Sequence, residues 1–440
     1  MKTGLLYLML TVMACCPSAA HGQGRSGGSP GGMPSNMPMP RDITGPRDLP
    51  GRGPPEWNDN ASSRGSSGLE QADIARDQRL SKTQSDRATL IARDRPADYE
   101  LDRNGALAVR GEVLTSGLEA YQLARIERAG FKVIRRSEIA ELGITVEVVE
   151  HDDLSASQAI KRLRRIDPDG RFDLNHVYFE SSAGPAQGLV ASVPMQSSTG
   201  ARAVVGMIDT GVAPIVESSA RVRIVRRSFS SGPAVAAHGT AVAALLARER
   251  GMITIYAADI FGVGMQGGTA ELLARALGWM ASQRVPVINV SMVGPSNGLV
   301  GAATNAMIVR GYIIVAPVGN DGPRAELLYP ASYPGVIAVS AAGADGRLLP
   351  EASRVKRVDF VGPGIATVPD PSGRMTVVRG TSFAAPIVSR QLADLVTSPN
   401  PGAARRALSL LSSKAIRRRA SGNAFGRGLV GIDLLAEVAK

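Results

Sequence analysis

The chain has 440 residues, 44% of them hydrophobic and only 4% aromatic, and its formal net charge is +11. This length leaves room for two compact domains and a tail. A basic chain can bind nucleic acid, but the arginines are scattered and few aromatic residues accompany them, so we expect no nucleic-acid partner. Both cysteines, Cys15 and Cys16, lie near the N-terminus, which excludes a disulfide framework and a thiolate metal site in the rest of the chain.

Residues 1–22 are typical of an export signal. Lys2 supplies a short positive region, the apolar run Gly4–Met13 follows, and small residues near the end suit cleavage. The run is too short to span a bilayer as a mature helix. We therefore expect an exported protein, periplasmic or secreted, with no transmembrane segment after the signal. The residues before Cys15 loosely resemble a lipoprotein box, so attachment of a lipid to Cys15 is the alternative.

Residues 23–104 are rich in Gly, Pro, Ser and Arg and show no apolar period. Such a composition cannot bury enough apolar surface to offset the entropy of the chain. We predict a disordered tract there and assign it no function.

A small ordered domain is predicted over residues 105–180 from alternating strand and helix patterns. Its strands are expected at Ala106–Thr115, Phe131–Arg135, Ile144–Glu150 and Arg171–Phe179, and its helices at Gly117–Gly130 and Ser155–Ile166. This β-α-β-β-α-β order is the split βαβ motif, which many unrelated domains share. We expect its two histidines, His151 and His176, to be exposed.

A Gly-, Ser- and Ala-rich linker at 181–202 leads to a larger domain at 203–440, where short apolar strands alternate with helices. The strands are expected at Ala203–Ile208, Thr254–Ala258, Val285–Val290, Tyr312–Val318 and Val336–Ala341, and the helices near Gly239–Arg250, Thr269–Ser282, Val300–Arg310 and Ser382–Ser398. Near-continuous apolar strands between helices predict an α/β fold, with a mostly parallel sheet covered on both faces. Active sites of such folds lie at the carboxyl ends of the strands.

Four polar residues of the larger domain could perform chemistry. His238 lies at a helix start in A-H-G-T-A, where the helix dipole should lower its pKa and keep the imidazole neutral, as a general base requires. Asp209 ends the first apolar strand, and Asn320 follows the strand that ends near Val318. Ser382 begins a helix in G-T-S-F-A-A-P. Each residue also has a purely structural interpretation, in a turn or at a helix start.

The motif D-T-G at Asp209 also occurs in aspartic proteases, but their chemistry needs a second carboxylate motif, which the sequence lacks. The order Asp209, His238, Ser382 is that of subtilisin. Together, D-T-G, H-G-T and G-T-S-F-A-A-P make the larger domain resemble the subtilisin-like serine proteases, or subtilases. Further matches are N-V-S-M at 289–292, G-N at 319–320, Y-P-A-S-Y-P-G-V-I-A-V at 329–339 and the closing F-G-R-G-L-V-G-I.

The resemblance implies a serine endopeptidase. Ser382 would attack the scissile carbonyl, His238 would act as general base and then acid, and Asp209 would orient the imidazole. The Asn320 side chain and the Ser382 backbone N–H would form the oxyanion hole. We expect no cofactor and no metal, because the calcium-binding loops of the family are not evident.

The resemblance also implies an extended substrate that pairs as an added strand. The segment that would bind it is Ser291, Met292, Val293 and Gly294. The family usually has glycine after Ser-Leu here, so Met292 and Val293 depart from its pattern, and Pro317 and Gly319 would lie near the primary specificity pocket. A small or medium apolar residue is expected before the cleaved bond.

The domain at 105–180 resembles, more weakly, the propeptides of these enzymes, which template folding of the catalytic domain and then inhibit it. A slowly folding parallel sheet gives such a template a physical purpose. We therefore expect a monomeric precursor that acts on peptides or proteins and cleaves itself within Phe179–Gly200. A permanently attached accessory domain is the alternative for 105–180. For the whole protein, the alternatives are a catalytically silent protease-fold scaffold of the cell envelope and a basic envelope-binding adapter.

Overall fold

The computed structural model describes residues 84–181, 202–248, 251–262, 267–325, 327–353, 357–417 and 424–431. All of them belong to the unit formed by residues 61–440. The expected export signal, Cys15, most of the predicted disordered tract and nearly all of the predicted linker lie outside the described residues. Within the described part, no helix combines the length and the apolar character needed to cross a membrane.

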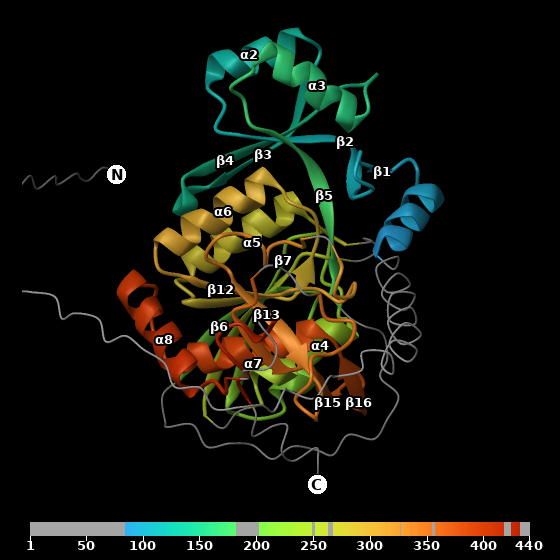
Figure 1. Cartoon of the computed structure of the whole chain (residues 1–440). Helices are drawn as coiled ribbons and strands as arrows, with labels where there is room; N and C mark the ends of the chain where they lie inside the picture. The colour runs from blue at the N-terminus through green and yellow to red at the C-terminus, as the bar shows by residue number, and fades with distance from the viewer. Residues whose placement is uncertain are drawn as a thin grey trace, which may run out of the picture. The chain divides into compact units, whose positions relative to one another are not determined.

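A seven-stranded sheet lies at the centre of the larger domain (Figure 1). In spatial order its strands are β14 (Phe360–Pro363), β13 (Ile337–Ala342), β12 (Ile313–Pro317), β10 (Val287–Val290), β6 (Ala203–Asp209), β8 (Ile253–Asp259) and β7 (Val222–Ser228). All neighbouring strands are parallel. The strand order changes direction between β6 and β10, and such a switch point is where open α/β sheets bind ligands.

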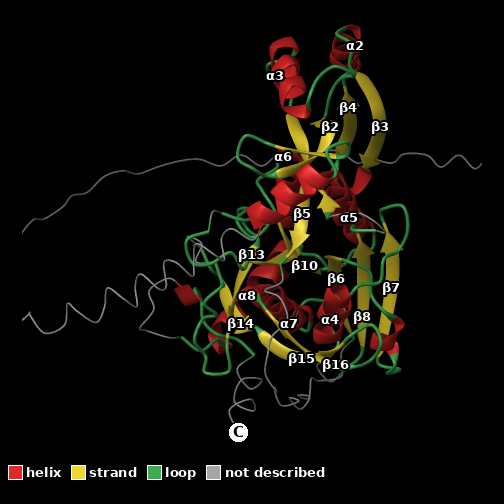
Figure 2. Ribbon diagram, turned by 90° about the vertical axis from the view of Figure 1, so that its right-hand side faces the viewer, coloured by secondary structure: helices red, strands yellow, loops and turns green. Residues whose placement is uncertain are grey.

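Helices cover both faces of this sheet (Figure 2). One face packs on α4 (Ala237–Leu246), α7 (Thr381–Ala393) and α8 (Pro401–Lys414), and the other on α5 (Ala270–Ser282) and α6 (Gly298–Val309). A short helix, η2 (Pro214–Glu217), follows β6, and the antiparallel hairpin β15 (Ile365–Pro369) and β16 (Met375–Arg379) leads into α7. The predicted α/β fold is confirmed.

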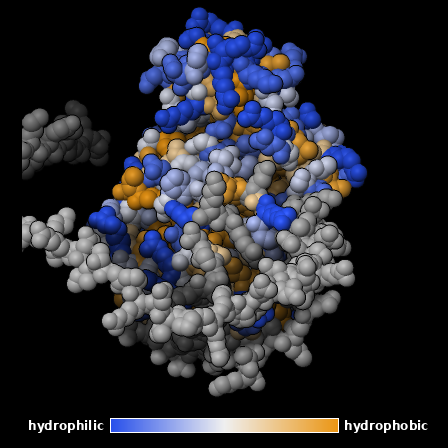
Figure 3. Space-filling model, viewed as in Figure 1, coloured by the Kyte–Doolittle hydropathy of each residue, from blue (hydrophilic) through white to orange (hydrophobic). Residues whose placement is uncertain are grey.

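The small domain has the expected order of elements. They are β2 (Leu107–Ser116), α2 (Ala120–Arg128), β3 (Lys132–Ile139), η1 (Ala140–Leu142), β4 (Ile144–Glu150), α3 (Ala156–Ile166) and β5 (Phe172–Glu180). Its antiparallel sheet runs β5-β2-β4-β3. The apolar sides of α2 and α3 pack on one face of this sheet, and the hydrophilic side chains of the domain cover much of its surface in Figure 3.

Residues 84–104 are ordered, which corrects the C-terminal end of the predicted disordered tract. Residues 84–94 are helical, and β1 (Tyr99–Leu101) pairs antiparallel with β2. Ala88, Ile91 and Tyr99 pack in one cluster with residues of β5. The segment contains too few apolar residues to form a periodic pattern, so its composition did not predict these elements. They are stabilised by tertiary contacts.

The strand β5 leaves the small domain and enters the larger one. It lies between β9 (Gly268–Thr269) and β11 (Met292–Val293) and is antiparallel to both. The sheet of the small domain thereby continues into the larger domain. The small domain also contacts the larger one through Arg135, whose side chain donates to Glu271 of α5 at 2.8 Å.

His176 of β5 is buried, with 6% of its surface exposed, which corrects the expected exposure. Its Nε2 lies 3.4 Å from Asp102 Oδ2, and its Nδ1 lies 3.3 Å from the amide nitrogen of Asn297. The histidine is therefore enclosed where the two domains meet.

Candidate active site

Asp209 lies at the carboxyl end of β6, the edge of the sheet where a site was expected. Its side chain is buried, and its Oδ1 accepts hydrogen bonds from the backbone N–H of Thr210 at 2.7 Å and from the Thr210 hydroxyl at 3.2 Å. These donors fix the carboxylate in one orientation.

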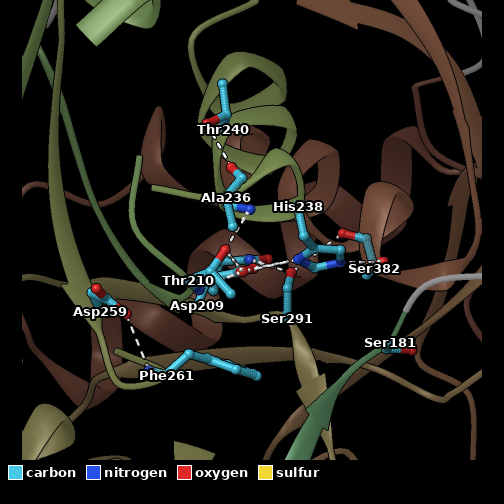
Figure 4. A network of polar contacts seen from close by, with 12 residues as sticks. Ser181, Asp209, Thr210, Ala236, His238, Thr240, Asp259, Phe261, Ser291 and Ser382 are labelled. Atoms are coloured by element: carbon cyan, nitrogen blue, oxygen red, sulfur yellow. Dashed lines mark hydrogen bonds and ion pairs between the residues drawn. The ribbon is translucent and has the colours of Figure 1, made fainter. Parts of the chain in front are cut away.

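His238, in the first turn of α4, lies between Asp209 and Ser382 (Figure 4). Its Nδ1 is 2.8 Å and 3.1 Å from the two carboxylate oxygens of Asp209, and its Nε2 is 3.1 Å from the Oγ of Ser382. All three side chains are buried. This is the arrangement that a serine, a histidine and an acid need for a proton to pass from the hydroxyl to the imidazole.

The pKa of His238 is raised, which corrects the lowering expected from the helix dipole. Burial by itself lowers this pKa, but the charge of Asp209 and its hydrogen bond to the imidazole outweigh burial, and the charge of Glu180 adds to them. A full negative charge in direct contact exceeds the fractional charge of a helix end. The site therefore favours the protonated imidazolium that forms during reaction.

The H-G-T motif brings α4 close to the end of β6. A Cβ on Gly239 would lie 2.3 Å from the carbonyl oxygen of Thr210, so only glycine fits. The backbone N–H of Gly239 donates to the Thr210 hydroxyl at 2.9 Å. The Thr240 hydroxyl donates to the Ala236 carbonyl and accepts from the N–H of Ala213. The motif thus ties the helix that carries the histidine to the strand that carries the acid.

Ser382 is the second residue of α7, and the helix begins directly after Gly380, whose φ is +139°. The ring of Phe383 packs 5.3 Å from the imidazole of His238. Behind the serine, the Ser291 hydroxyl donates to the Ser382 carbonyl at 3.2 Å and accepts from the amide of Asn289 at 2.6 Å. Ser291 therefore supports the backbone of the candidate nucleophile.

Asn320 is the fourth residue of the constellation. Its Oδ1 accepts from the backbone N–H of Thr381 at 2.9 Å, which turns its Nδ2 toward the end of β5. That Nδ2 donates to the carbonyl oxygen of Ser181 at 2.8 Å. An amide donor aimed at a peptide carbonyl beside a serine hydroxyl is the geometry of an oxyanion hole.

Asp321, the next residue, was not anticipated. Burial raises the pKa of its carboxyl to about 7. The site therefore carries an additional negative charge next to Asn320 only above neutral pH.

The remaining residues predicted for substrate binding are divided among several places. Met292 and Val293 pair with Glu180 and Phe179 of β5, and Gly294 lies against the ring of Tyr178. The other two lie elsewhere along the chain: Pro317 ends β12, and Gly319 has a φ of +102° in the turn that follows. The motifs did not reveal the opposite wall of the cleft, Gly268 and Thr269. A G-G-T run was its only sequence signal.

The model of the Subtilase family matches residues 172–428, more than half of the chain. The chain belongs to the subtilase family. Subtilisin DY from Bacillus licheniformis is 29% identical to this subtilase over 272 residues, which are 56% of this chain and 94% of the relative. Subtilisin E from Bacillus subtilis (strain 168) is 24% identical over 306 residues, 64% of this chain and 78% of the relative.

Solved structures show the same fold. Fervidolysin from Fervidobacterium pennivorans, described as a keratinolytic enzyme related to subtilisin, superposes with a TM-score of 0.59 at 21% identity. The match covers 77% of this subtilase and 63% of the fervidolysin chain, just under two thirds of it. A mutant of the epidermin leader peptide processing protease of Staphylococcus aureus has a TM-score of 0.57 at 14% identity, over 75% of this chain and all of that one. The family makes this chain a serine endopeptidase.

Proposed function

We propose that the chain hydrolyses peptide bonds through an acyl-enzyme, with Ser382 as nucleophile, His238 as general base and acid, and Asp209 as the group that orients the imidazole. The observation that carries this proposal is the continuous pair of contacts from Asp209 through His238 to the Ser382 hydroxyl. A catalytically silent scaffold would not need all three groups at hydrogen-bonding distance.

The chemistry proceeds in two steps. The Ser382 oxygen bonds to the substrate carbonyl carbon while its proton passes to His238 Nε2, and the carbonyl oxygen takes up the negative charge beside the Asn320 amide. The C–N bond then breaks, and the imidazolium returns the proton to the departing amine. Water, deprotonated by the same imidazole, attacks the ester and releases Ser382 with its proton restored.

We further propose that the chain is a precursor that cuts the bond between Ser181 and Ser182. The hydrogen bond from Asn320 to the Ser181 carbonyl supports this, because a scissile carbonyl oxygen would accept from the same amide. The pairing of β5 with both β9 and β11 is that expected of an extended substrate. The proposal narrows the expected range, Phe179–Gly200, to one bond, and makes the small domain the first inhibitor of the enzyme.

The test uses the full chain and its Ser382→Ala variant. A serine-reactive fluorophosphonate should label only the wild type, and mass spectrometry should find a new N-terminus at Ser182 only in the wild type. In subtilisin, loss of the serine lowers kcat about 10⁶-fold, so residual processing of the variant should be negligible. A folded wild-type protein that is not labelled would contradict the proposed serine protease activity. Labelling with an intact Ser181–Ser182 bond would contradict only the cleavage site and would favour a permanently attached domain.

We also propose export, on the basis of the signal-like residues 1–22. Fractionation of the producing cells should place the processed protein outside the cytoplasm. Replacing Cys15 by serine should leave that location unchanged if the signal is cleaved conventionally, and should release the protein from the membrane if Cys15 is lipidated.

A further inference from the structure

Tyr178 is the fourth residue counted back from the bond that we propose is cut, and its side chain is 0% exposed. Successive side chains of a strand point to opposite faces. Phe179 therefore turns away toward the helix at 84–94, whereas Tyr178 turns into the larger domain and joins its main apolar cluster. The cleft thus receives one large side chain of β5 in a closed pocket.

Glycine makes room for this ring. A Cβ on Gly294 would lie 2.5 Å from Cδ1 of Tyr178 and 2.9 Å from its Cγ. On the opposite strand, a Cβ on Gly267 would lie 2.5 Å from the Tyr178 carbonyl oxygen. The pocket therefore accepts a flat aromatic ring because the wall at Gly294 lacks a side chain, whereas Gly267 lets the opposite wall approach the backbone of Tyr178.

The far end of the pocket is polar. The Tyr178 hydroxyl donates to the carbonyl oxygen of Pro295 at 3.0 Å, and the Tyr333 hydroxyl lies near it. Tyr333 is held in place by Asn297, whose carbonyl accepts from the Tyr333 hydroxyl at 2.7 Å and whose N–H donates to it at 2.9 Å. Burial raises the pKa of Tyr333 to about 12 and that of Tyr178 well above its usual value, so both hydroxyls keep their protons.

We propose that this pocket selects tyrosine over phenylalanine at the fourth residue before the cleaved bond, in substrates as well as in the chain itself. This inference rests on the proposed protease function and names its substrate class. A phenylalanine would fill the same space but would leave the part-buried Pro295 carbonyl without the donor that tyrosine supplies. A site built to hydrogen-bond a hydroxyl discriminates strongly against the analogue that lacks it.

The test compares two fluorogenic peptides on the protein produced as the full chain: acetyl-Val-Tyr-Phe-Glu-Ser-aminomethylcoumarin and the same peptide with phenylalanine in place of tyrosine. We expect kcat/KM to favour the tyrosine peptide by roughly tenfold or more. Equal kcat/KM for both peptides would overturn the selectivity and leave the protease function standing. If neither peptide were cleaved in a Ser382-dependent way, the proposed function itself would fail.

Two variants localise the effect. Tyr333→Phe removes the hydroxyl that lies near that of Tyr178 and makes this end of the pocket less polar, so the tyrosine-to-phenylalanine ratio should fall several-fold. Tyr312→Phe is the control, because the hydroxyl of Tyr312 is also buried but donates to Ala281, away from the cleft; its ratio should not change. Each ratio compares two peptides on the same protein sample. A loss of folded enzyme lowers both rates equally and therefore leaves the ratio unchanged. A ratio unchanged by Tyr333→Phe would overturn the role of Tyr333.

Gly294→Ala tests the pocket independently of any hydroxyl. The added methyl group would collide with the ring, so kcat/KM for both aromatic peptides should fall relative to a peptide with valine at that position. An unchanged preference for the aromatic ring would contradict the assignment of Gly294 to this pocket.

Discussion

The contact between Asp209 and His238 depends on a residue that takes no part in the chemistry. Gly239 lets the first turn of α4 approach the carbonyl of Thr210 more closely than any side chain would allow. The imidazole is positioned by that approach rather than by its own rotamer alone. In a triad, an error of about 1 Å costs about 100-fold in rate.

We therefore predict that Gly239→Ala lowers kcat/KM at least about 100-fold, because the methyl group pushes α4 and His238 away from Asp209. Gly232→Ala is the matched control, since a Cβ there meets no atom within 4 Å. Peptide hydrolysis and circular dichroism of both variants provide the measurement. A Gly239→Ala protein with wild-type kcat/KM would contradict this account.

Glu180 should influence how the proposed precursor cleavage depends on pH. Its charge contributes to the raised pKa of His238, and the reaction needs the neutral imidazole. Removing that charge lowers the pKa of His238, so more of the base is neutral at acidic pH. Glu180→Gln should therefore shift the pH profile of precursor cleavage toward lower pH.

The rate of appearance of the Ser182 N-terminus, followed between pH 5 and 8, measures this shift. Glu138→Gln removes an exposed carboxylate of the small domain and should leave the profile in place. A shift toward higher pH in Glu180→Gln would have the wrong sign and would reject the explanation.

At the scale of elements, the helix at 84–94 covers the strand that fills the cleft. Ala88 and Ile91 pack with Val177 and Phe179, and the guanidinium of Arg87 lies 4.8 Å from the centre of the Phe179 ring. The face of β5 that points away from the catalytic domain is thereby shielded from water. This helix should help to keep β5 in place after the chain is cut.

Ile91 and Leu90 are neighbours on that helix but differ in burial: 8% of Ile91 is exposed and 49% of Leu90. Ile91→Asp places a charge against Phe179 and should detach the helix, whereas Leu90→Asp changes only the solvent-facing side. We expect the cleaved small domain to dissociate at least about tenfold faster in Ile91→Asp, as measured by the recovery of peptide hydrolysis after processing. Equal rates in the two variants would exclude this role for the helix.

At the scale of the whole molecule, β5 also completes two helices of the larger domain. The Asp173 carboxylate accepts from the N–H of Gly298 at the start of α6 at 2.8 Å. The Asn175 side chain accepts from the N–H of Glu271 in the first turn of α5 at 3.2 Å. Helix N-termini leave such donors unpaired, so the small domain supplies hydrogen bonds that the larger one cannot make within the helices themselves.

Asp173→Ala should therefore weaken the hold of the cleaved small domain by about tenfold or more. Asp152→Ala removes a carboxylate of the same domain whose ion pair, among the described residues, is with the exposed Lys132, and should have little effect. Size-exclusion chromatography directly after cleavage shows how much of the small domain remains bound. Equal retention in both variants would contradict the capping role.

The sequence predicted the elements with a clear period and the residues within motifs. The strand Ile144–Glu150 was predicted with its observed bounds, and the motifs identified all four residues that meet around Ser382. They could not reveal β9, because two residues establish no period. The burial of His176 and the order at 84–104 were missed because both depend on contacts between distant segments. The raised pKa of His238 needed the distance to Asp209, which no sequence provides.

The cleft walls, β9 and β11, have only two residues each, and a single strand separates them. If β5 leaves after the proposed cleavage, the space between two such edges fits one extended backbone and excludes a helix or a paired hairpin. A protein would have to unfold locally before its chain could enter. The cleft would therefore select substrates first by their extended conformation and only then by their side chains. Loops and loosened termini of a folded protein would be cut first.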